Sequence, residues 1–157
     1  MTELMEGLKF AKGIDPVADA FAGTVYSDVY SMRAHGRILF VAYVGVGATG
    51  SSTFTVESCD DFVPTNTTAI AFWSREITSG DTDGAITRRA AAGFVNTVGS
   101  SKIVLIEVDA KDLPAGEPNV RLAMVESVDS PVLGGVMVIA GGKPTRYAKQ
   151  INATIIA

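Results

Sequence analysis

The amino-acid sequence predicts an all-β fold: an antiparallel β-sandwich or jelly-roll-like domain of about seven to nine strands, with an irregular N-terminal arm. Two observations predict this class. Short runs of β-branched and aromatic residues recur roughly every 10–15 residues, separated by turn-forming residues. Almost no segment keeps the apolar spacing of a helix. The 157 residues suit one domain, which we divide into an arm (1–23), a sandwich (24–142) and a basic tail (143–157).

The arm is predicted from its lack of any sustained pattern. Residues 1–23 contain three glycines and a proline, and their apolar residues give at most one or two amphipathic turns. Residues 15–21 are a candidate short helix, with Asp15 as its N-cap and Pro16 at the first helical position. Because so short a helix is marginal alone in water, we expect this segment to lie over the domain or over a neighbour.

Three extended segments open the predicted sandwich. Residues 24–31 contain two valines and two tyrosines. Residues 37–46 read RILFVAYVGV and have apolar side chains on both faces, so we expect a central strand that is covered on two sides. Residues 52–59 form the clearest half-buried strand, because Phe54, Val56 and Ser58 alternate with threonine and glutamate.

The middle of the chain has weaker signals. Residues 69–75 are the next predicted strand and contain the only tryptophan, Trp73. Residues 78–87 have the composition of a loop, with two glycines and two aspartates. We expect about one helical turn over residues 88–93 and a short strand over residues 94–98.

The stretch 102–140 has the strongest strand pattern in the sequence. It predicts strands over residues 103–108, 120–126 and 132–140, joined by two compact turns. In the second of these strands, valine, leucine and methionine occupy one face. The pair Gly134-Gly135 inside the third strand indicates a bulge or a close approach of another backbone.

The charge of the chain argues against nucleic acid as a direct partner. The formal net charge is −4 and the pI is about 4.9, whereas nucleic-acid-binding domains are typically basic. The tail is different, because Lys143, Arg146 and Lys149 have no acidic neighbour in it. It is either a solvated terminus or a strap that docks on an acidic surface, and residues 152–156 are a candidate edge strand.

No apolar run approaches the roughly 20 residues of a membrane-spanning helix, so no membrane partner is expected. Charged residues interrupt the first 21 positions, which excludes a secretory leader there. We therefore expect a soluble protein made in a cytoplasm. Cys59 is the only cysteine, so there is no internal disulfide and no cysteine-based metal cluster.

The sequence contains no recognisable catalytic constellation. The only histidine, His35, is expected to be an exposed turn residue between basic neighbours. Cys59 precedes two aspartates, Asp60 and Asp61, which disfavour a thiolate, so a small core residue is expected. The segment Asp81-Thr82-Asp83-Gly84 resembles the start of a calcium loop but lacks the later glutamate, so an ordinary turn is expected. The sequence predicts no enzyme, no cofactor and no metal site.

Several segments between Tyr26 and Tyr147 resemble a family of small virion proteins of tailed bacteriophages. They include YSDVYSM, TFTVESCDD, IEVDAKDLP and VRLAMVESVDSPVLGGVMVIAGG, together with short motifs between them. The short motifs are Gly47 to Gly50, Asn66 to Ile70, Gly80 to Thr82, Ala91 to Phe94 and Arg146-Tyr147. The resemblance covers about three-quarters of the chain and rests on turns and strands rather than on catalytic signatures.

This resemblance implies a structural role in a virion. The leading hypothesis is a cement or decoration protein on the outer surface of an HK97-like capsid, made in the bacterial host and bridging neighbouring subunits of the major capsid protein. A tail-tube, neck or head-tail connector subunit is the first alternative. The second is a module that binds host-surface glycans through Tyr43, Trp73 and the loop at residues 81–84.

Both terminal segments are the candidate contact regions in this hypothesis, and self-association as a dimer or trimer is expected because it would cover exposed strand edges. The candidate interface residues are Leu4, Leu8, Phe10, Phe21, Lys143, Arg146, Tyr147 and Lys149.

Overall fold

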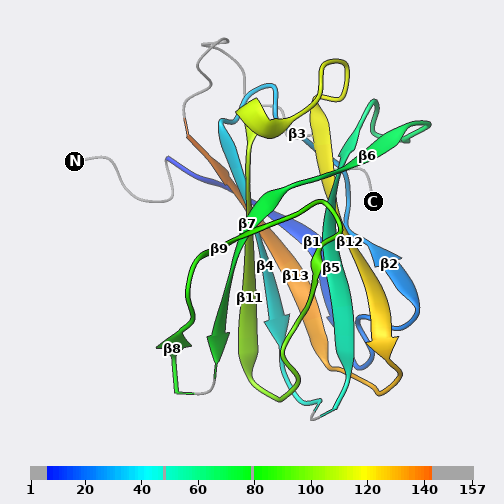
Figure 1. Cartoon of the computed structure of the whole chain (residues 1–157), viewed down its shortest axis with the longest axis vertical. Coiled ribbons are helices and arrows are strands. Elements are labelled where there is room, and N and C mark those ends of the chain that lie inside the picture. Colours follow the sequence, from blue (N-terminus) through cyan, green and yellow to red (C-terminus); the bar gives the residue numbers. More distant parts are fainter. Residues whose placement is uncertain (1–6, 48, 79, 143–157) are drawn as a thin grey trace.

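The computed structural model describes residues 7–47, 49–78 and 80–142, which form two antiparallel β-sheets packed face to face (Figure 1). This confirms the predicted all-β sandwich. The helical content of the described residues is one 3₁₀ turn, η1 (Ala110–Asp112), which Asp109 caps by accepting a hydrogen bond from the Lys111 amide. No helix in these ranges is long and apolar enough to span a membrane.

The large sheet has seven strands. Its spatial order is β1 (Lys9–Val17), β13 (Gly134–Gly141), β4 (Arg37–Val44), β11 (Lys102–Asp109), β7 (Phe72–Thr78) and β8 (Thr82–Asp83), and β9 (Thr87–Arg89) also pairs with β7. The central strand β4 pairs along its whole length with both β11 and β13. This agrees with the central position predicted for residues 37–46.

The small sheet has six strands. Its main order is β10 (Phe94–Val95), β5 (Ser51–Cys59), β12 (Asn119–Val128) and β2 (Thr24–Tyr26), while β3 (Tyr30–Ser31) pairs with β12 and β6 (Thr67–Ile70) pairs with β5. The long pair β5–β12 forms its centre.

The core lies between the two sheets, where period-two alternation points one side chain in two inward. Phe54 and Val56 of β5 are fully buried, as are Leu122 and Met124 of β12, which confirms the predicted inward faces of both strands. Phe54 stands at the centre of an aromatic cluster. Its ring lies 6.0 Å from that of Phe21 and 5.9 Å from that of Phe94, measured between centroids.

The prediction of an irregular arm over residues 1–23 is wrong for residues 9–17. Residues 9–17 form the edge strand β1, which pairs with β13, and the candidate helix over residues 15–21 is absent. The pairing shifts register between Lys12 and Ile14 and again between Ile14 and Val17. These irregularities accommodate Pro16, which an edge strand tolerates because one row of its amides pairs with no neighbour.

The segment predicted as one strand over residues 69–75 contains two. β6 ends at Ile70 in the small sheet, β7 begins at Phe72 in the large sheet, and Ala71 joins them (Figure 1). The helical turn expected over residues 88–93 is also wrong, because Arg88 and Arg89 belong to β9 and pair with Trp73 and Phe72. Cross-strand pairing overrides the helix propensity of the alanine run that follows. The basic tail, residues 143–157, lies outside the described residues.

Candidate interaction surface

The outer face of the large sheet is largely apolar. The outward side chains of β4 alternate with fully buried ones. Val41 and Tyr43 face Leu105 and Ile103 of β11, whereas Leu39 faces Glu107 and Arg37 faces Asp109, so this surface is bounded by charged residues at that end. We call the apolar set the aliphatic face. Its members are Phe10, Leu39, Val41, Tyr43, Ile77, Ile103, Leu105, Met137 and Ile139.

Strand geometry indicates the size of this surface. The aliphatic face crosses five strands, β1, β13, β4, β11 and β7. With strands about 4.8 Å apart and side chains covering about 20 Å along them, its area is on the order of 400 Å². A patch of this size equals the largest found on typical monomers, and such patches commonly mark interaction sites.

The outer face of the small sheet has a different composition. Glu57 and Arg121 form an ion pair across β5 and β12 at 2.7 Å, and the Arg121 guanidinium lies 4.0 Å from the centre of the Tyr26 ring. Thr53 hydrogen-bonds Ser127 at 2.8 Å. This mostly polar face has the chemistry of a solvated surface, so the two sides of the sandwich are chemically distinct.

One part of the aliphatic face is hollowed into an apolar groove of about 750 Å³ between β1, β13 and β4. Its floor runs past Gly45, Gly134 and Gly135, where neighbouring atoms lie too close for a larger residue. A Cβ at Gly135 would lie 3.0 Å from the Ile14 carbonyl oxygen and from the Pro16 nitrogen. This confirms the predicted close backbone approach at Gly134-Gly135.

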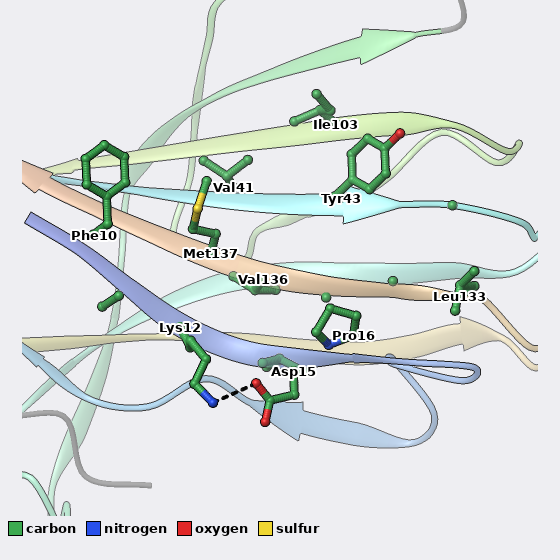
Figure 2. A pocket seen from close by; sticks show the side chains of 15 residues that line it. Phe10, Lys12, Asp15, Pro16, Val41, Tyr43, Ile103, Leu133, Val136 and Met137 are labelled. Atoms are coloured by element: carbon green, nitrogen blue, oxygen red, sulfur yellow. Dashed lines mark hydrogen bonds and ion pairs between the residues drawn. The ribbon is translucent and has the colours of Figure 1, made fainter. Parts of the chain in front are cut away.

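The walls of the groove come from both ends of the chain (Figure 2). Figure 2 shows Phe10 and Pro16 of the β1 side together with Tyr43, Met137 and Leu133 around the hollow. Two of the lining residues carry a charge, Lys12 and Asp15, and they pair with each other at 3.0 Å. The groove therefore offers apolar contact with few polar groups to orient a small polar ligand.

The predicted interface residues have different outcomes. Phe10 lies on the aliphatic face and is 43% exposed, and Leu8 packs beside Gly141 at the end of β13. Phe21 is 4% exposed in the core, so it has no surface to offer a partner, because its ring is needed against Phe54. Leu4 and the four tail residues, Lys143, Arg146, Tyr147 and Lys149, lie outside the described residues.

The expectation that His35 is exposed is wrong. Its side chain is buried, and its Nε2 atom has no hydrogen-bond partner among the described residues. Burial, together with the positive charge of Lys9, lowers the pKa of His35 below the ordinary 6.5. The lowered pKa favours the neutral imidazole near neutral pH.

We expect His35 to make stability depend on pH. Its pKa is lower in the fold than in the unfolded chain, so below about pH 6.5 the unfolded chain binds a proton that the folded chain excludes. The free energy of unfolding should thus fall as the pH drops from about 7.5 to 5.5, by at most about 1.4 kcal/mol per pH unit. Urea titrations of the wild type and of His35→Gln would measure this. A constant difference between the two proteins across that range would contradict the prediction.

Cys59 is a buried core residue, as predicted. Burial, chiefly, raises the pKa of its thiol to about 11, so the thiolate is scarce near neutral pH. The neighbouring Asp60 organises a turn by accepting hydrogen bonds from Thr65 and Asn66, which hold the pKa of its carboxyl well below the usual range. No group of three or more His, Cys, Asp or Glu side chains in the described ranges has a metal-binding arrangement.

The residues considered for glycan binding are spread apart. Tyr43 and Trp73 share the outer side of the large sheet, but Tyr43 is level with Ile103 and Ile77, and Trp73 lies four residues further along β7. That offset is about 13 Å. Asp83 pairs with Arg75 at 3.3 Å, and the Gly84 amide bonds the Glu76 carbonyl, as in a tight hairpin. The aromatic rings and this turn do not converge on one pocket.

Val41, Met137 and Ile103 are surface residues that the sequence pattern alone does not identify as a candidate site. Their signal was present, because apolar residues on both faces of residues 37–46 predicted cover on two sides. The small sheet covers one side of β4, and no described segment covers the other.

Comparisons with known proteins identify no family for this chain. No protein-family model and no curated protein matches the chain. Among solved structures, the chain is similar to the CBM22-1 and GH10 modules of Clostridium thermocellum endo-1,4-β-D-xylanase 10B, complexed with xylohexaose, with a TM-score of 0.37 and 14% identity. The match covers 92% of this chain and 28% of the xylanase chain. A similarity at this level supports no inference about function.

Proposed function

We propose that the protein is a non-enzymatic structural component of a tailed-bacteriophage virion. In this proposal it decorates the outer surface of an HK97-like capsid and bridges neighbouring subunits of the major capsid protein. The aliphatic face is the observation that carries the proposal, because an apolar surface of this size, opposite a polar face, favours a protein partner. The motif resemblance between Tyr26 and Tyr147 indicates the virion as the setting.

The chemistry of the surface favours a protein partner over a sugar. A glycan needs polar groups that converge on its hydroxyls, whereas the groove is lined almost entirely by apolar residues and its Lys12 and Asp15 pair with each other. Many modest apolar contacts, repeated by symmetry, reinforce a shell without any single tight interface. The acidic net charge of −4 fits an outer surface better than contact with packaged DNA.

The test is the position and number of copies in the intact particle. Mass spectrometry of purified virions should detect the protein, and an icosahedrally averaged cryo-EM map should show it between capsomers at hundreds of copies. Six or twelve copies at the portal vertex would instead favour the neck or connector alternative. Absence from the virion would refute the proposal.

A single substitution tests the contact surface. Ile139→Glu places a carboxylate on the aliphatic face outside the groove lining, between Leu39 and Phe10, where docking would bury it without a partner. We expect at least about a tenfold loss of affinity for shells assembled without the protein, or about 1.4 kcal/mol. Thr55→Glu, on the outer face of the small sheet, should bind like the wild type. Co-sedimentation with purified shells measures both, and equal binding of the two variants would assign the contact elsewhere.

A further inference from the structure

The groove on the aliphatic face has a concave shape that can select its ligand more narrowly than the surface around it. Gly45, Gly134 and Gly135 lie along its floor, and residues from β1, β4 and β13 wall it. Its apolar lining suits an extended peptide with alternating apolar side chains. No described residue of the chain fills it.

We propose that this groove is the docking site of the C-terminal segment of the chain, residues 151–156, from the same molecule or from a neighbouring copy. The segment reads Ile-Asn-Ala-Thr-Ile-Ile. In an extended conformation, Ile151, Ala153 and Ile155 would face one side and Asn152 and Thr154 the other. That pattern fits an apolar groove on one side and solvent on the other.

The length of the chain beyond β13 allows this docking. The described residues end at Gly142, directly after β13, and the groove lies back along that strand near Gly135. Gly141 lies six positions after Gly135 along the strand, a distance of about 20 Å. Ile151 lies nine positions after Gly142, and that stretch spans up to about 30 Å when extended. The connecting segment is therefore long enough to reach the groove of its own molecule, and it leaves the same sheet that contains the groove.

The distribution of charge also favours docking of the C-terminal tail on the described part of the chain. Residues 7–142 carry ten basic and fifteen acidic side chains, a formal charge of −5, whereas residues 143–157 carry +3. The basic residues of the tail are attracted to the acidic residues 7–142. This attraction brings residues 151–156 close to the groove. Leu39, Ile77 and Leu105 lie outside the groove lining, so a docked tail leaves them free for another partner.

Disulfide trapping in the full-length protein tests the proposal. Cys59 is buried and its thiol pKa is raised to about 11, so introduced cysteines react without interference from it. Met137→Cys places a thiol in the groove, and Ile155→Cys places one in the tail. Val125→Cys is the matched control on the outer face of the small sheet, because Met137 and Val125 are both 44% exposed.

We expect mild oxidation to join positions 137 and 155 at least about tenfold faster than positions 125 and 155, because docking raises the effective concentration above that of tethering alone. Adding Ile151→Asp to the 137/155 pair should lower the yield several-fold. Peptide mapping by mass spectrometry identifies the bond, and non-reducing gels show whether it forms within a chain or between chains.

Three outcomes would overturn the proposal: equal rates for the two pairs, no bond at position 137, or a predominant 137–137 bond. The last would mean that a second copy covers the face. The experiment uses the free protein without capsids, so its failure leaves the proposed capsid contact open. Conversely, tail docking can be demonstrated even if the protein is absent from virions.

Discussion

Replacement of Phe54 by alanine is expected to lower the free energy of unfolding by about 3–5 kcal/mol. The Phe54 ring is fully buried and touches an aromatic ring from each side, Phe21 from the segment after β1 and Phe94 from β10. Truncation removes both contacts and leaves a cavity that the paired strands around it have little freedom to close. Urea denaturation followed by tryptophan fluorescence and circular dichroism measures the change.

Phe10→Ala is the matched control for this experiment. The chemical change is identical, but Phe10 is 43% exposed on the aliphatic face. Its truncation should cost about 1 kcal/mol or less. A loss as large as that of Phe54→Ala would mean that Phe10 is covered by another part of the chain or by a second molecule. A small loss for Phe54→Ala would contradict the assignment of the core.

Gly93→Ala is the second substitution with a large expected effect. Gly93 has a φ of +79°, and a Cβ there would lie 2.1 Å from the Phe54 carbonyl oxygen. The backbone of β10 must therefore move away from β5. We expect a loss of at least about 3 kcal/mol, combining left-handed strain of about 1–2 kcal/mol with the steric conflict.

Gly116→Ala separates these two contributions. Gly116 also has a positive φ, +89°, but nothing lies within 4 Å of its added Cβ. Its substitution should cost about 1–2 kcal/mol, from backbone strain alone. Thermal and urea unfolding of both variants provide the comparison. Equal losses at the two positions would show that the contact with the Phe54 carbonyl is relieved at little cost.

The sequence predicted the strands with the strongest alternation. Residues 52–59 and 120–126 correspond to β5 and β12 because one face of each strand is buried in the core and the other is outside it. The edge strand β1 was missed because Gly13 and Pro16 sit at register shifts, where regular alternation is lost. The change of sheet at Ala71 was missed because it depends on pairing with β5 and β9, which a local pattern does not contain.

The candidate surface was predictable only in outline. Apolar residues on both faces of β4 predicted that other segments would cover both faces. Among the described residues, the small sheet covers one face, and the other belongs to the aliphatic face. Phe10 was assigned to a contact region and lies on that face, but Phe21 was assigned with it and is in the core. The groove needed the register between β1 and β13, which brings Gly135 beside Ile14 and Pro16. Tertiary pairing of this kind cannot be read from spacing along one strand.

The passage of the chain through Ala71 bears on how the domain comes apart. Ile70 is paired with Val56 in one sheet, and Phe72, only two residues later, is paired with Arg89 in the other. Because a single residue connects the two pairs, neither sheet can move relative to the other without breaking backbone hydrogen bonds next to Ala71. The sandwich should therefore lose both sheets in one cooperative transition, with a single denaturant slope, rather than open sheet by sheet. A protein built this way resists shear between its two faces.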